Sequence, residues 1–189
     1  MKQSPIQLLQ LTFRKVLVEI DPQHAPTEPP NPMTSVFIFD GVNIATEVTL
    51  GELDMTHDRG PIYLVTLRVL VDNQPQPEAP DAQFSPYLID VSAAGVILLP
   101  KGAEALGPAA DLVSVNGASL LWSAIREQVL ALSSRMPAGP VMLPTVHFHD
   151  LKQGDASQAE HEAAARKAIA EEEHALAKAK RTTAKARKV

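Results

Sequence analysis

Histidine offers the clearest chemical possibility in this sequence. His147 and His149 are two residues apart, so an extended segment projects both imidazoles from one side. Neutral imidazole is a common zinc ligand. Four more histidines are candidates for a third ligand: His24, His57, His161 and His174. A metal-dependent enzyme is therefore one alternative, although the chain has no His-Glu-x-x-His motif and no clear carboxylate partner beyond Asp150.

Other patterns of catalytic residues are missing from the sequence. The chain has no Cys, which excludes thiol nucleophiles, disulfides, Cys-based zinc sites and iron–sulfur clusters. The 9 glycines are scattered and form neither a phosphate-binding loop nor a Gly-x-Ser-x-Gly turn. We therefore predict that the chain is not an enzyme and uses no cofactor.

Length and composition indicate one domain with an appendage. The chain has 189 residues, of which 45% are apolar and only 4% aromatic, so the core must be aliphatic. No apolar run approaches the roughly 20 residues that span a bilayer, and the N-terminal stretch is too interrupted for a signal peptide. We expect a soluble, cytoplasmic protein that does not insert into membranes.

Charge divides the chain near residue 150. Residues 1–150 contain 8 Lys or Arg and 16 Asp or Glu, a net charge of −8, whereas residues 151–189 contain 9 and 6, a net charge of +3. An acidic body does not favour nucleic-acid binding, which depends on clustered Lys and Arg. Nucleic acid is therefore expected, if anywhere, at the basic tail.

Four segments have the character of β-strands, separated by proline-rich loops at residues 24–32 and 74–80. Residues 6–20 change alternation phase twice, which predicts a strand with a bulge. Residues 42–50 alternate as a half-buried strand does. Residues 62–71 are apolar on both faces, as in a strand covered on both sides, and residues 87–91 give a fourth strand that bends or ends at Gly95.

A helical period replaces the strand period after the fourth strand. Residues 117–136 place apolar side chains in steps of 3 and 4, which predicts an amphipathic helix capped by Asn116. From residue 156 onward the chain is rich in Ala, Glu, Lys and Arg with almost no apolar face, which predicts a solvated helical tail. The predicted fold class is α+β, with a four-stranded antiparallel sheet followed by a long helix. One helix leaves apolar sheet surface uncovered, so we expect self-association.

This order of motifs resembles the SecB family of protein-export chaperones. Residues 62–71 (IYLVTLRVLV), a proline-rich loop and residues 87–99 (YLIDVSAAGVILL) are similar to the third and fourth strands of that family, including the spacing of Val91 and Gly95. Residues 120–151 are similar to its long helix, with an Ala-Arg-Glu element, a Gly-Pro turn and the positions that follow. The resemblance spans roughly residues 5–151, so the predicted domains are a SecB-like domain at 1–151 and a tail at 152–189.

The chain departs from the family pattern in two places. The family usually has an Asn-Phe-Asp element where this chain has His147-Phe148-His149. Family members usually end in an acidic tail that engages the SecA motor, and this tail is basic. The second departure puts standard coupling to SecA in doubt.

The resemblance implies a homotetramer, a dimer of dimers, that binds unfolded polypeptides without nucleotide. It implies general export of precursors through the Sec translocase, with SecA as a possible partner contacted by Asp90. The dedicated chaperone or adaptor of a single partner, such as an antitoxin, is the alternative. The candidate groove residues are Phe37, Phe39, Ile44, Val146 and Phe148. The candidate oligomer-interface residues are Ile89, Val91, Ala93, Leu121 and Ile125.

Overall fold

The structure, a computed structural model, describes residues 4–28, 30, 37–75 and 82–152. The chain divides into two compact units, Met1–Phe148 and His149–Val189. The first contains β1 (Gln7–Ile20), β2 (Ala45–Asp54), β3 (Ile62–Val71), β4 (Tyr87–Leu98), the 3-10 helix η1 (Ala103–Leu106) and α1 (Ala109–Ser133). The described part of the second unit contains the 3-10 helix η2 (His149–Leu151). The predicted helical tail lies outside the described residues.

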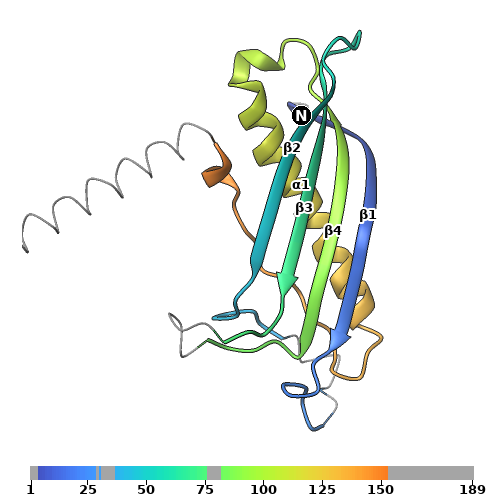
Figure 1. Ribbon diagram of the computed structural model, residues 1–189, viewed down its shortest axis with the longest axis vertical. Coiled ribbons are helices and arrows are strands. Elements are labelled where there is room, and N and C mark those ends of the chain that lie inside the picture. The colour runs from blue at the N-terminus through green and yellow to red at the C-terminus, as the bar shows by residue number, and fades with distance from the viewer. Residues whose placement is uncertain (1–3, 29, 31–36, 76–81, 153–189) are drawn as a thin grey trace, which may run out of the picture. The chain divides into compact units, whose positions relative to one another are not determined.

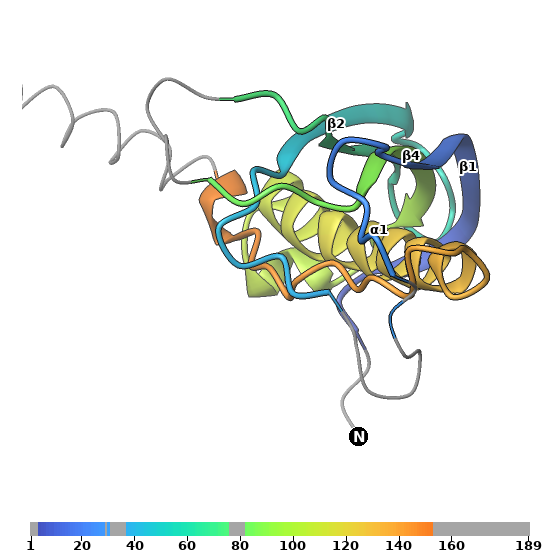
Figure 2. The same ribbon diagram turned by 90° about the horizontal axis from the view of Figure 1, so that it is seen from below.

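The four strands form one antiparallel sheet in the order β1-β4-β3-β2, and α1 packs on one face of it. Figure 1 shows the sheet with α1 behind it, and Figure 2 shows the same two layers from below. The α+β prediction is therefore confirmed.

Alternation along β3 determines where the core lies. Tyr63, Val65, Leu67, Val69 and Val71 are at most 5% exposed, whereas the residues between them are half-buried. The buried row faces α1, because successive strand residues point to opposite faces. The prediction that β3 is covered on both sides is wrong, since among the described elements only α1 covers the sheet, and it covers one face.

Two glycines let α1 approach the sheet closely. A β-carbon at Gly117 would lie 2.6 Å from Ile97 Cδ1 and 3.0 Å from Val65 Cγ2. A β-carbon at Gly95, within β4, would lie 3.1 Å from side-chain atoms of both Leu121 and Leu8. Gly95 was expected to bend or end the fourth strand, but β4 continues through it to Leu98.

The two edge strands are less covered than the central pair. β1 has register shifts at Leu8/Gln10 and Phe13/Lys15, which confirms the bulge predicted from its changes of phase. β2 begins at Ala45 rather than at Val42, and every residue in it except Val48 is exposed. The half-buried strand predicted there is therefore wrong, because α1 packs mainly against β3 and β4.

Helix α1 starts earlier than its sequence pattern indicates. It begins at Ala109 after Pro108, a residue type that suits the start of a helix because its missing N–H needs no partner there. Asn116 lies inside the helix and its amide donates to the Leu112 carbonyl at 2.7 Å, so it is not the N-cap. The helix ends at Ser133, whose hydroxyl accepts a hydrogen bond from the Val141 N–H at 3.0 Å.

Candidate functional site

Two hollows lie side by side along one flank of α1. The larger, about 410 Å³, is lined by Phe37, Ile38, Phe39, Asp40, Arg126, Met142, Leu143 and Pro144. The smaller, about 200 Å³, is lined by Ser123, Arg126, Glu127, Leu130 and Met142. Because Arg126 and Met142 border both, the hollows form one groove with these two side chains at its middle, and we call it the α1 groove.

One wall of the α1 groove is an irregular segment, residues 141–144. Hydrogen bonds from side chains of α1 hold this segment in place. The Trp122 indole donates to the Pro144 carbonyl at 2.9 Å, and Arg126 Nε donates to the Leu143 carbonyl at 2.7 Å. Ser133 binds the Val141 N–H. These side chains satisfy backbone groups that lack a strand partner, so the segment stays extended beside the helix without joining the sheet.

Residues 37–40 also line the groove and pair with the irregular segment through a bridge between Phe37 and Val141. The Phe37 N–H donates to the Pro140 carbonyl at 3.4 Å, and the Phe37 and Phe39 rings meet edge to face with centroids 5.2 Å apart. Phe39 is 6% exposed, but the side chain between the two rings, Ile38, is 74% exposed. This short stretch therefore anchors itself through Phe39 and presents Ile38 to solvent at the groove.

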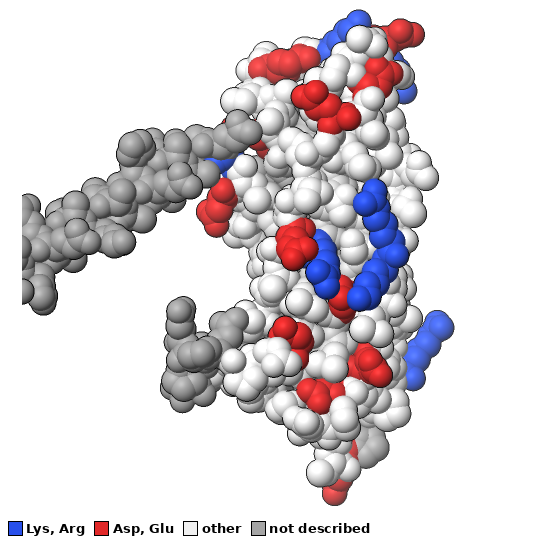
Figure 3. Space-filling model, in the orientation of Figure 1, with Lys and Arg blue, Asp and Glu red and all other residues white. Residues whose placement is uncertain are grey.

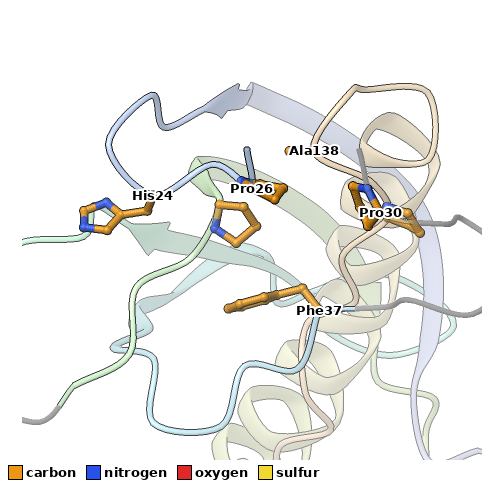
Figure 4. Close-up of a pocket in the computed structure, with 7 residues that line it drawn as sticks. His24, Pro26, Pro30, Phe37 and Ala138 are labelled. Atoms are coloured by element: carbon orange, nitrogen blue, oxygen red, sulfur yellow. The ribbon is translucent and has the colours of Figure 1, made fainter. Parts of the chain in front are cut away.

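A third hollow, about 320 Å³, lies on the other side of Phe37. Its described lining is mostly apolar and contains four prolines. The lining residues are His24, Pro26, Pro30, Phe37, Pro86, Ala138 and Pro140. Figure 4 shows Pro26 and Pro30 on one side of this hollow and Phe37 on the other. Phe37 thus separates the proline-lined hollow from the α1 groove, and both are apolar surfaces of the kind that hold apolar side chains.

A polar network supports the loop that carries His24. His24 Nδ1 and Asp21 Oδ2 are 2.7 Å apart, and Asn73 Nδ2 donates to the same oxygen at 2.6 Å. The hydrogen bonds, that from His24 above all, hold the pKa of the buried Asp21 carboxyl below its usual range. Asn73, at φ 53°, also binds both the carbonyl and the N–H of Ser85. The Asp21–His24 pair is therefore part of the structural connection between the end of β1 and the loop before β4.

The predicted groove residues are only partly brought together. Phe37 and Phe39 line the α1 groove. Phe148 is 8% exposed and packs beside Trp122, with ring centroids 6.0 Å apart. Ile44 and Val146 are half-buried and, like Phe148, are not among the residues that line the three hollows.

Asp90 lies on the sheet face opposite α1, in the middle of a charged cluster. Arg68 donates to both Asp90 carboxylate oxygens at 2.9 Å, and Lys15 Nζ lies 2.6 Å from Oδ2. The Arg68 hydrogen bonds, aided by Lys15 against the cost of burial, lower the pKa of Asp90 to about 2. Glu47 lies 3.6 Å from Arg68. Figure 3 shows the blue and red side chains meeting on this face. Asp90 is 6% exposed, and Arg68 and Lys15 neutralise its charge within the chain.

The residues predicted at an oligomer interface lie in the core of a single chain. The core row of β4 contains Ile89, Val91 and Ala93, and the core face of α1 contains Leu121 and Ile125; each of the five is at most 1% exposed. Their alternation along the strand and their helical spacing indicated two apolar surfaces. Within one chain, the sheet and the helix cover these surfaces by packing against each other. An interface between copies must use other side chains.

Several residues of the site have no distinct signal in the sequence. Arg126, Met142 and Pro144 meet in the groove although 16 or more residues separate Arg126 from the other two. Arg126 is the only Lys or Arg in α1, which is the one local sign of its role. The cluster of Lys15, Arg68 and Asp90 depends on strand pairing, so spacing along the chain does not indicate it.

The histidines are not gathered into a metal site within the described part of the chain. There, no three His, Cys, Asp or Glu side chains lie close enough together to share a metal ion. His147 and His149 are exposed. In the same residues, no helix is long and apolar enough to cross a membrane.

The chain has distant structural likeness to solved proteins. No protein-family model matches the chain, and no curated protein matches its sequence. Among solved structures it is similar to the Mycobacterium tuberculosis Rv1957 SecB-like chaperone in complex with a ChAD peptide from the Rv1956 HigA1 antitoxin. The identity is 14%, the match covers 75% of this chain and 91% of that one, and the TM-score is 0.38.

Proposed function

We propose that this protein is an ATP-independent chaperone that binds unfolded polypeptides in the α1 groove. The observation that carries the proposal is the combination of Phe37, Ile38 and Phe39 with Met142, Leu143 and Pro144 in the lining of one hollow. Non-native chains expose apolar side chains, and an apolar groove of this kind binds them by burying that surface. No nucleotide or metal is needed for such binding, so the proposed function is not enzymatic.

Exposed apolar side chains outside the groove fit the same proposal. The edge strands carry Leu9, Leu17 and Leu53 at 46%, 40% and 54% exposure. An edge strand with exposed apolar side chains can pair with an extended segment of another chain. Client segments longer than the groove therefore have further surface to occupy.

Ile38 provides the sharpest test. Because its side chain is exposed, a substitution there can change client binding without changing the stability of the fold. Ile38→Asp places a charge on the groove wall without disturbing the core, so we expect suppression of client aggregation to fall at least fivefold while the circular dichroism spectrum and melting temperature stay unchanged. Leu106→Asp is the matched control, since Leu106 is 71% exposed on η1 and lines none of the three hollows. Assays run without ATP and with a metal chelator should give the same result.

Two outcomes would contradict the proposal. Equal activity of Ile38→Asp and Leu106→Asp would show that the α1 groove is not the binding surface. Activity that chelator abolishes and zinc restores would instead favour a metal site that includes His147 and His149.

The protein could serve many exported precursors or one dedicated partner, and one observation favours the dedicated partner. General export through the Sec translocase would use Asp90 as an acidic contact for SecA, whereas a dedicated chaperone would bind a single partner such as an antitoxin. Asp90 is neutralised by Arg68 and Lys15 and is 6% exposed, so it offers little negative charge to a partner. A pull-down from the native cell distinguishes them, because many precursors indicate export and one stoichiometric protein indicates a dedicated partner.

A further inference from the structure

Arg126 is the charged side chain at the middle of the α1 groove, and its geometry restricts what the groove can bind. Its Nε donates to the Leu143 carbonyl at 2.7 Å and its Nη2 donates to Met142 Sδ at 2.8 Å. These two bonds fix the plane of the guanidinium against the groove wall. A guanidinium held in this way can bind a ligand group without first losing side-chain freedom.

The guanidinium retains unused donors. It has five N–H groups, of which the two bonds to Leu143 and Met142 use two. The other three have no acceptor among the described residues. No described carboxylate lies within 4.0 Å of Arg126, since the ion pairs of the described chain involve Lys15, His24 and Arg68 instead. Among the described residues, the cation therefore has no ion-pair partner within 4.0 Å.

We propose that Arg126 makes the groove selective for a carboxylate within an apolar client segment. This inference rests on the proposed function, since it names the group that a bound polypeptide presents at Arg126. The planar fork of arginine matches the two oxygens of a carboxylate, and a charge-assisted pair of this kind is about twice as strong as a neutral hydrogen bond. A client segment seated against the apolar side chains of Phe37, Phe39 and Leu143 would displace water from around the pair, which strengthens the attraction.

The neighbouring acidic residues limit the selectivity to one carboxylate. Asp40 borders the larger hollow and Glu127 borders the smaller one, and both are exposed. A second acidic residue on either side of the first would meet one of these like charges. The two hollows extend to either side of Arg126, so the client chain continues past this point in both directions. The favoured client segment is therefore apolar, with a single carboxylate supplied by an Asp or Glu side chain within the segment.

Three labelled peptides of about ten residues, each with the same apolar flanks, test the proposal against the full-length protein. The first has a central Glu and an amidated C-terminus, the second a central Gln and an amidated C-terminus, and the third a central Gln and a free C-terminal carboxylate. Fluorescence anisotropy gives each Kd. We expect the first peptide to bind about tenfold tighter than the second and the third, as one charge-assisted pair contributes. Tighter binding of the third peptide than of the first would place a C-terminal carboxylate at Arg126 and overturn the assignment to a side chain.

Variants at Arg126 then show whether this residue causes the preference. In Arg126→Met the ratio of Kd values between the uncharged and charged peptides should fall from about ten to about one. The ratio is the decisive quantity because a general weakening of the groove leaves it unchanged. Arg135→Met is the matched control, since Arg135 is exposed beyond the end of α1, and it should keep the full ratio.

Arg126→Lys covers the case in which Arg126→Met fails to fold after losing its bond to Leu143. Lysine keeps the charge and one donor but has no fork, so we expect the ratio to fall by about threefold. Equal binding of all three peptides by the unaltered protein, or an undiminished ratio in a folded Arg126 variant, overturns this inference and leaves the proposed function intact. Failure of the unaltered protein to bind any peptide overturns the proposed function and this inference together.

Discussion

At the scale of single residues, the most constrained charge is the Asp90 carboxylate. Its partners come from different strands, Lys15 on β1 and Arg68 on β3, and both reach across the open face of the sheet. Their hydrogen bonds lower the pKa of Asp90 to about 2 although burial acts in the opposite direction. The carboxylate is therefore ionised in the folded chain at any pH above that value.

Asp90→Asn should destabilise the fold in a pH-dependent way. The folded pKa is depressed below an unfolded value of about 3.9, so the stabilisation is fully present above pH ~4 and is lost as pH falls toward about 2. We expect the variant to lose about 1–2 kcal/mol of unfolding free energy at pH 7. Urea titrations at several pH values measure this loss, with the exposed Asp58→Asn as control. A difference from the unaltered protein that persists undiminished at pH 2 would contradict this account of Asp90.

At the scale of elements, the position of α1 against the sheet decides which surfaces remain open. The helix packs on β3 and β4 through Val113, Leu121, Ile125 and Val129, all fully buried. The flank that carries Trp122, Arg126 and Ser133 then holds residues 141–144 by hydrogen bonds to the backbone. The groove is therefore a consequence of how close the helix lies to the sheet.

Gly117→Ala should test that close approach. The added β-carbon would lie 2.6 Å from Ile97 Cδ1, so α1 or the Ile97 side chain must shift. Alanine favours a helix by about 1 kcal/mol over glycine, but overpacking of a core typically costs about 1–3 kcal/mol. We expect a net loss of stability of about 1–2 kcal/mol in urea unfolding at fixed protein concentration. Ser119→Ala, on the exposed side of the same helix, should change stability by less than about 0.5 kcal/mol. A Gly117→Ala protein as stable as the unaltered one would show that the helix shifts freely.

At the scale of the whole molecule, β1 leaves an apolar row only partly covered. Strand pairing places this row on the α1 side of the sheet, because its members lie opposite Ile97, Gly95, Ala93, Val91, Ile89 and Tyr87. The row consists of Leu8, Leu11, Phe13, Val16, Val18 and Ile20. Each is half-buried or exposed, with Leu8 at 38% and Val16 at 42%. A continuous apolar row of this kind is typical of surfaces that associate.

Val16→Asp should therefore separate copies of the chain. We expect the unaltered protein to be a dimer or a tetramer in light scattering at micromolar concentration, and the variant to have a smaller mass with an unchanged circular dichroism spectrum. Leu53→Asp, at a more exposed position on β2, is the control and should keep the larger mass. Val91→Asp, in contrast, should unfold the chain because Val91 is fully buried. A monomeric unaltered protein would contradict this prediction.

The sequence alone determined the elements whose signals are local. The changes of alternation in residues 6–20 correspond to the bulges of β1, and the period of residues 117–133 corresponds to most of α1. The start of α1 was missed, because Val113, Ser114 and Val115 are weak helix formers and Asn116 resembles an N-cap. Phe37 and Phe39 were named as groove candidates on the resemblance to the SecB family, and both line the α1 groove.

Tertiary structure alone decided which apolar surfaces are core and which are site. Apolar alternation looks the same whether the chain's own helix or another molecule covers it, so Val91 and Ile125 were expected at an interface and lie in the core. Strand register brings Lys15 and Arg68 onto Asp90, and the packing of α1 brings Arg126 to Leu143. These contacts join residues 17 to 75 positions apart. No local pattern encodes such pairings, because they depend on how the sheet and the helix come together.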